Sequence, residues 1–164
     1  MFNSPFSQDS KNNITIPEDI DIVFVSDLFS NDHIGGAELT TDALIESSPY
    51  SIFRLYAKDL TPEIISENSS KYWIFGNFTS MSYNLIPTII SSLKYSVIEY
   101  DYKYCKYRSS DKHFAAEQKP CDCNEQMVGK MVSAFYFAAD CMWWMSEKQK
   151  QVYHKMFPFL GRIK

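Results

Sequence analysis

Five short runs of apolar and aromatic residues alternate with stretches of helical periodicity along the 164 residues of this chain. A run that is apolar on both faces suits a strand of a parallel sheet, and parallel strands are joined by crossover helices. The alternation therefore predicts an α/β fold with a parallel sheet of about five strands, in the order 3-2-1-4-5, and helices on both faces. The expected strands are residues 19–26, 51–57, 71–75, 95–100 and 141–145.

The first expected strand is followed by a polar loop that ends in Gly35 and Gly36, and then by a helical pattern over residues 37–45. A strand, a glycine turn and a helix in this order direct backbone N–H groups and the positive end of the helix dipole at one place, where a phosphate can bind. Leu39 and Ala43 are expected on the inward side of this helix, with Leu44 as a further candidate. The alternative is that the two glycines only form a tight turn that lets the helix pack closely.

Ligands of such sheets bind outside the carboxyl ends of the strands, where the strand order reverses. For the order 3-2-1-4-5 this place lies between the first and fourth strands. The loops expected there are residues 27–36, 76–79 and 99–105.

Composition and charge narrow the class of protein. Hydrophobic residues make up 45% of the chain and charged residues 22%, which is typical of one globular domain. A formal net charge of −4 argues against an extended nucleic-acid surface. No apolar run approaches the roughly 18–20 residues of a membrane span, and the first residues lack the pattern of a signal peptide, so we expect a cytoplasmic protein.

We expect residues 1–18 to form a flexible or surface-draped arm, because they are polar and show no periodicity. The folded domain is expected over residues 19–160. Within it, residues 101–124 form a long insertion that we expect to be irregular. A helix is also expected over residues 80–93, with a kink or a late start at Pro87.

Three cysteines and one histidine lie close together in the insertion: Cys105, His113, Cys121 and Cys123. Three thiolates and an imidazole form a good tetrahedral ligand set for zinc, and a segment with few aliphatic residues needs some other source of order. The spacing C-x7-H-x7-C-x-C is not that of a standard zinc finger, so unpaired thiols and a partial disulfide remain alternatives. Cys141 is expected in the core of the last strand.

Two short segments resemble a known family. Gly35-Gly36-Ala37-Glu38 follows the first expected strand, and Met145-Ser146-Glu147-Lys148-Gln149 follows the last. This arrangement resembles the amino-terminal, Rossmann-like half of a GT-B glycosyltransferase of the family-4 type. The loop after the fourth strand of that family usually carries a histidine or a His-Asp pair. Here the loop reads Glu99-Tyr100-Asp101-Tyr102, which contains no histidine and makes Asp101 the catalytic candidate.

The resemblance implies a nucleotide-sugar donor, with Gly35 and Gly36 against its diphosphate, and an acceptor in the same half. Residues implied to line the cleft are His33, Glu38 and Asn77. It also implies a second, carboxyl-terminal domain in cis or in trans, residues 161–164 as the start of the linker to it, and little sugar transfer by this half alone. The alternative function is a non-catalytic binding or assembly module, which could form a homo-oligomer.

Overall fold

The computed structural model describes residues 14–162, and these residues form one α/β domain. Its strands are β1 (Ile22–Ser26), β2 (Ile52–Tyr56), β3 (Tyr72–Phe75), β4 (Lys94–Glu99) and β5 (Cys141–Trp144). Its helices are α1 (Gly36–Ser47), α2 (Pro62–Glu67), α3 (Ile86–Ser92), α4 (Ser110–Glu117), α5 (Met127–Phe137) and α6 (Glu147–Met156). The five predicted strands and the parallel pairing are confirmed.

The order of the strands differs from the prediction. The sheet runs β2-β1-β3-β4-β5, whereas we expected 3-2-1-4-5. Both orders are doubly wound and have the same alternation of strands and helices along the chain, so the hydrophobic pattern does not tell at which crossover the chain reverses direction. In the observed order the reversal lies between β1 and β3, and not between the first and fourth strands.

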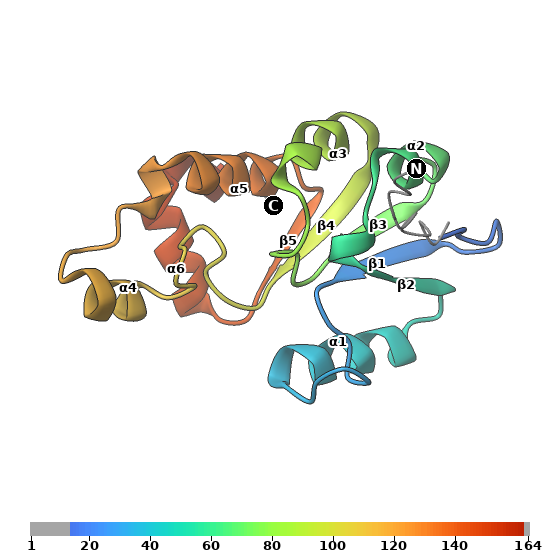
Figure 1. Ribbon diagram of the computed structural model, residues 1–164, viewed down its shortest axis with the longest axis horizontal. Coiled ribbons are helices and arrows are strands. Elements are labelled where there is room, and N and C mark those ends of the chain that lie inside the picture. The colour runs from blue at the N-terminus through green and yellow to red at the C-terminus, as the bar shows by residue number, and fades with distance from the viewer. Residues whose placement is uncertain (1–13, 163–164) are drawn as a thin grey trace, which may run out of the picture.

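The crossovers distribute the helices unevenly over the sheet. The connection from β1 to β2 runs in one direction across the sheet, and the connections from β2 onward run in the other. Right-handed crossovers therefore place α1 on one face and α2, α3 and α5 on the opposite face, as Figure 1 shows. The last helix, α6, packs on the α5 side through Tyr153, whose ring centroid is 5.6 Å from that of Tyr136.

The main core lies between the sheet and the three-helix face. Its centre is a group of buried aromatic rings in which Phe135 of α5 stacks on Tyr95 at 4.8 Å and meets Phe75 edge-on at 5.1 Å. Trp144 belongs to this side and packs on Tyr153, whereas its neighbour Trp143 points to the opposite face of the sheet and is 41% exposed. This alternation is the one expected for adjacent residues of a strand.

The inward side of α1 is partly polar. Leu44 packs on the small apolar cluster of the α1 face, but the other two residues expected there do not lie inward. Leu39 is 53% exposed and Ala43 is exposed, whereas Thr41 and Asp42 are buried. The polar side chains are accommodated because they have partners: the Thr41 hydroxyl lies 2.7 Å from the Tyr100 hydroxyl, and Asp42 pairs with an arginine of β2 at 3.0 Å. Specific hydrogen bonds thus override the hydrophobic periodicity here.

Helix termini follow the sequence signals closely. Thr61 caps α2 by accepting a hydrogen bond from the backbone N–H of Ile64, and Ser146 caps α6 in the same way from Gln149. Pro87 lies in the first turn of α3, where its missing N–H is not needed, so the late start of this helix is confirmed. The insertion is more regular than predicted, since it contains α4 and a 3₁₀ turn over Cys123–Glu125.

Two further expectations concern the ends of the chain and membranes. Residues 1–13 of the predicted arm and residues 163–164 of the predicted linker lie outside the described residues. Within residues 14–162 no helix combines the length and the apolar character that crossing a membrane requires. A cytoplasmic location stays a prediction.

Candidate metal centre

Four potential metal ligands come from three consecutive pieces of the insertion. Cys105 lies in a turn after β4, in which its carbonyl accepts a hydrogen bond from the N–H of Arg108 at 2.8 Å. His113 lies on α4 and is the only buried side chain of that helix. Cys121 and Cys123 follow α4, and Cys123 begins the 3₁₀ turn. The fold thus joins residues that are up to 18 positions apart in sequence.

The ligand atoms are close enough to share one ion. The three sulfurs and a ring nitrogen of His113 all lie within 4.8 Å of one another. Nδ1 of His113 is 3.5 Å from Sγ of Cys123 and 3.7 Å from Sγ of Cys105. In a tetrahedral zinc site, Zn–S and Zn–N bonds of about 2.3 and 2.0 Å imply a sulfur–nitrogen separation of about 3.5 Å. These two sulfur–nitrogen separations therefore match a tetrahedral site, and the remaining ligand pairs, at up to 4.8 Å, would close around the ion.

The surroundings of the cluster also fit a cation. Burial raises the pKa of the Cys121 thiol to about 12, and the neighbouring Cys105 thiol adds to this effect. A divalent cation is the kind of group that stabilises such a thiol as a thiolate. All four cysteines are free thiols in this structure, so the partial disulfide that the sequence left open is not formed.

Gly129 of α5 lets the 3₁₀ turn pack directly on that helix. A Cβ atom at this position would overlap the carbonyl oxygen of Cys123 and would lie 2.9 Å from Cα of Asn124. These are backbone atoms that cannot rotate away, so any side chain here must push the turn off α5. The position of Cys123 therefore depends on this glycine.

We expect Gly129→Ala to weaken metal binding, although the substitution raises the helix propensity of α5 by about 1 kcal/mol. The added methyl group displaces Cys123 from the other ligands, whereas propensity alone would stabilise the protein. A competition titration of zinc against a chromophoric chelator measures the effect. The matched control is Ser133→Ala on the same helix; unchanged zinc affinity in Gly129→Ala would contradict the assigned role of this glycine.

A buried ion pair adjoins the metal centre. Glu99 at the end of β4 and Lys103 are both fully buried, and Nζ of Lys103 lies 2.6 Å from Oε1 of Glu99. The other carboxylate oxygen accepts hydrogen bonds from the hydroxyls of Tyr136 and Tyr153, the latter at 2.7 Å. Burial and the Glu99 carboxylate raise the pKa of both phenols well above its usual value, so both remain protonated donors.

Asp101, the predicted catalytic residue, belongs to the same polar network. Its carboxylate pairs with the guanidinium of Arg108 and lies 3.5 Å from Nζ of Lys103. Arg108, in the left-handed backbone region with a φ of 55°, also donates to Oδ1 of Asn77 at 3.1 Å. Asn77 and Asp101 are therefore joined through one arginine, while Gln149 of α6 donates to the carbonyl of Asp101 at 3.1 Å.

The reversal point between β1 and β3 is filled by a carboxylate of the chain itself. Asp27, directly after β1, accepts hydrogen bonds from the backbone N–H and the hydroxyl of Thr79 at 2.9 and 2.7 Å. It accepts two more from Ser80, at 2.9 and 2.6 Å. These hydrogen bonds lower the pKa of Asp27 although burial opposes them. Asp27 thus ties together the two loops at which a ligand was expected.

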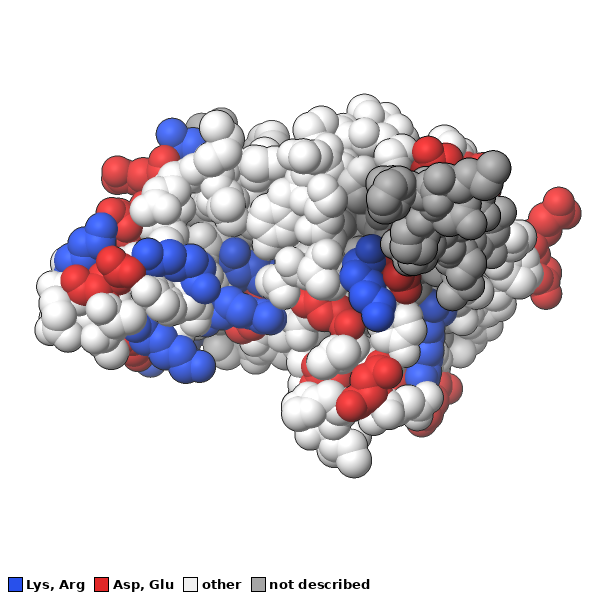
Figure 2. Space-filling view, in the orientation of Figure 1, with Lys and Arg blue, Asp and Glu red and all other residues white. Residues whose placement is uncertain are grey.

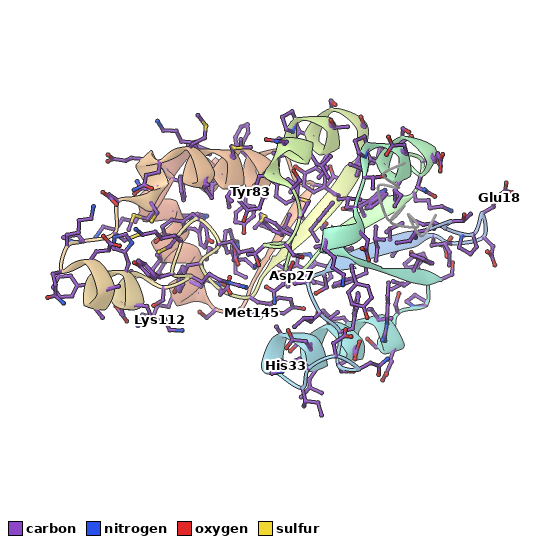
Figure 3. The ribbon with its side chains drawn as sticks, viewed as in Figure 1. Glu18, Asp27, His33, Tyr83, Lys112 and Met145 are labelled. Atoms are coloured by element: carbon purple, nitrogen blue, oxygen red, sulfur yellow. The ribbon has the colours of Figure 1, made fainter. Side chains whose placement is uncertain are left out.

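The predicted phosphate loop lies elsewhere, at the start of α1. Gly35 is the N-cap residue and Gly36 the first residue of this helix. A Cβ atom on Gly35 would meet a carboxylate oxygen of Glu38 and would lie 3.3 Å from the ring of His33, so these three residues are clustered. A Cβ atom on Gly36 would meet no atom within 4 Å. Figure 3 shows His33 beside α1, apart from Asp27 and from Lys112 on α4.

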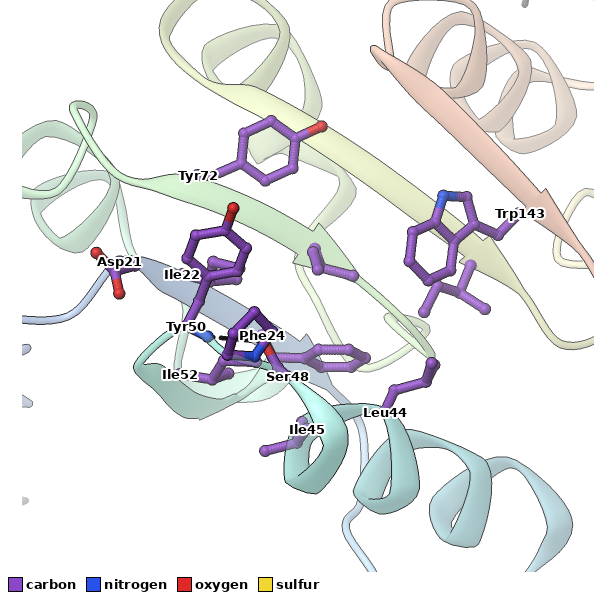
Figure 4. Close-up of a pocket in the computed structure, with 13 residues that line it drawn as sticks. Asp21, Ile22, Phe24, Leu44, Ile45, Ser48, Tyr50, Ile52, Tyr72 and Trp143 are labelled. Atoms are coloured by element: carbon purple, nitrogen blue, oxygen red, sulfur yellow. Dashed lines mark hydrogen bonds between the residues drawn. The ribbon is translucent and has the colours of Figure 1, made fainter.

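An apolar hollow of about 580 Å³ lies on the α1 face of the sheet. Its floor includes Ile74 and Ile98, and in Figure 4 Leu44 of α1 and Trp143 of β5 lie together at one end. The hollow exists because α1 covers only part of a five-stranded sheet. None of the predicted site residues lines it.

Charges of both signs are mixed around the carboxyl edge and α4, as Figure 2 shows. Lys106 pairs with Glu117 at 2.8 Å, and Lys119 pairs with Asp122 at 3.0 Å. The upper middle of the same view, over α3 and the nearby part of α5, is largely uncharged. Among residues 14–162, this face therefore offers no broad basic area for nucleic acid.

Sequence reasoning missed most of the buried network. Asp27, Glu99 and Lys103 were not candidates, although each lies at or just after the carboxyl end of a strand. The available signal was the spacing of Glu99 and Lys103, four residues apart at the end of a run that is otherwise apolar. The cysteine and histidine cluster, by contrast, is brought together as its spacing suggested.

Comparison with known proteins adds no family to this description. Neither a protein-family model nor a curated protein nor a solved structure matches the chain. The glycosyltransferase resemblance, the nucleotide-sugar donor and the second domain therefore stay predictions.

Proposed function

We propose that this chain is a zinc-stabilised α/β binding module, in which one structural zinc ion holds the insertion against the carboxyl edge of the sheet. The ligands are Cys105, His113, Cys121 and Cys123. The observation that carries the proposal is the convergence of their four ligand atoms within 4.8 Å. Soft thiolates with one imidazole in tetrahedral separation favour zinc over magnesium, calcium or manganese, which prefer oxygen ligands.

The ion is structural in this proposal because four protein side chains fill a tetrahedral coordination shell. Catalytic zinc sites keep one position for water or substrate, and this ligand set leaves none. The insertion also has a reason to need the ion: α4 buries a single side chain, so apolar packing contributes little to its stability. Zinc coordination supplies the missing folding energy locally.

We expect the purified chain to contain close to one zinc ion per molecule, because the four ligand atoms lie together and suffice to coordinate a single ion. Metal analysis by plasma mass spectrometry, after gel filtration in metal-free buffer, measures the content. Counting thiols with a thiol-reactive dye provides the control: three thiols should become reactive only after chelation. A folded chain that contains no metal and whose thiols react at once would contradict the proposal.

A further inference from the structure

We infer that Asp122 is a positioning residue for the metal centre, which accepts a hydrogen bond from His113 and orients its ring toward the ion. This inference rests on the proposed function. Asp122 lies between the two ligands Cys121 and Cys123 in sequence. It does not belong to the ligand set, and nothing in its sequence position sets it apart from other acidic residues.

One ring nitrogen of His113 faces the thiols. Nδ1 of His113 lies 3.5 and 3.7 Å from two cysteine sulfurs, so Nδ1 is the atom that would coordinate the ion. A coordinating nitrogen must be free of its proton, and a neutral imidazole then carries its proton on the other nitrogen. Nε2 of His113 is therefore an N–H donor whenever the metal is bound.

One carboxylate lies near Nε2 of His113 and could accept its hydrogen bond. Nε2 of His113 is buried and has no hydrogen-bond partner within the described residues. The nearest acid is Asp122, whose Oδ1 lies 3.9 Å from Nε2. This separation is about 1 Å longer than a hydrogen bond of about 2.9 Å. Binding of an ion would draw the ligand atoms together from separations of up to 4.8 Å, and Asp122 lies on the segment that would move with them.

The Asp122 carboxylate is oriented by two neighbouring side chains. Nζ of Lys119 lies 3.0 Å from Oδ2 of Asp122, and the side-chain amide of Gln126 donates to Oδ1 at 3.2 Å. The Asp122 side chain is 45% exposed and thus reaches the buried ring from the surface. A carboxylate that accepts the outer N–H of a ligating histidine fixes the tautomer and the ring orientation, and it increases the affinity of the site.

The test compares zinc affinity in Asp122→Ala, Asp122→Asn and the wild type by chelator competition. We expect Asp122→Ala to lose about 10–100-fold in affinity, as is usual for such partners of a ligand. Asp122→Asn retains an acceptor oxygen and should recover part of this loss. The matched control is Glu125→Ala, which removes an equal charge from an exposed residue of the same segment and should leave the affinity unchanged.

A second measurement separates orientation of the ring from a general effect on structure. In the zinc-bound wild type, nitrogen-15 NMR should show the proton of His113 on Nε2, with slow exchange against solvent, and Asp122→Ala should speed this exchange. Absence of zinc from the wild type would overturn the proposed function and this inference with it. Zinc-bound wild type with equal affinity in Asp122→Ala, or with the proton on Nδ1, would overturn this inference alone.

Discussion

Replacing Cys121 with serine is expected to abolish tight zinc binding and to loosen residues 101–126, while the sheet stays folded. A serine hydroxyl is a poor zinc ligand, and structural zinc sites contribute about 10–16 kcal/mol of apparent binding free energy. Loss of a direct ligand should therefore lower the affinity by more than the roughly 10–100-fold expected for the hydrogen-bond partner of a ligand. Chelator competition and hydrogen exchange followed by mass spectrometry measure the two effects.

The matched control is Cys141→Ser, because Cys141 is also a half-buried thiol but lies on β5, outside the cluster. It should retain one zinc ion and normal protection of the insertion. Exchange in β1, β3 and β4 should remain slow in both variants, since Cys121 only packs against the edge of the apolar core that these strands share. Equal loss of zinc in the two variants, or its retention in Cys121→Ser, would contradict the assignment of the ligands.

Breaking the buried ion pair should have the largest effect on global stability. Glu99→Gln leaves the ammonium group of Lys103 without its closest counterion in a fully buried position. Removing one partner of a buried pair typically costs about 3–5 kcal/mol, because the remaining charge is desolvated with too little compensation. Asp101, 3.5 Å from Nζ of Lys103, should offset only part of this cost. Urea denaturation followed by circular dichroism measures the free energy of unfolding.

Two further variants show whether the cost comes from the unpaired charge. The double variant with Glu99→Gln and Lys103→Met removes both charges and should recover most of the lost stability. Glu117→Gln breaks the exposed pair with Lys106 and should cost no more than about 1 kcal/mol. Equal losses in the free energy of unfolding for Glu99→Gln and Glu117→Gln would show that the buried pair stabilises the protein no more than the exposed pair.

The metal centre and the polar network are parts of one local structure. Lys103 and Cys105 are two positions apart, and the N–H of Arg108 donates to the carbonyl of Cys105. The turn that presents a metal ligand therefore also places Arg108 against Asp101. In this way a zinc ion in the insertion would fix the charged side chains at the carboxyl edge of the sheet.

The fold class could be predicted because it depends on a local pattern that is repeated along the sequence. Five apolar runs separated by helical segments determine a parallel sheet, and cap residues such as Ser146 mark the helix ends. The strand order was not predictable, since it depends on which way each crossover runs. Helix α4 was also missed, because its only buried side chain is His113 and it therefore has no apolar stripe to reveal it.

The candidate site was predictable to a similar degree. Cysteine and histidine are common metal ligands. Four of them within 19 residues were therefore enough to predict the ligand set from residue type and spacing. The partners of these residues could not, because Asp122 and Glu99 are ordinary acids whose roles arise from burial and from neighbours distant in sequence. The buried polar residues of α1 were missed for the same reason: Thr41 is buried where its hydroxyl meets that of Tyr100.

X-ray absorption at the zinc edge of the purified, zinc-loaded chain tests the zinc centre most directly. A structural site made by three cysteines and one histidine predicts three sulfur neighbours at about 2.3 Å and one nitrogen at about 2.0 Å from the metal. The spectrum should show no further oxygen neighbour at bonding distance. A shell of oxygen and nitrogen atoms with fewer than three sulfurs would contradict a zinc ion held by Cys105, His113, Cys121 and Cys123.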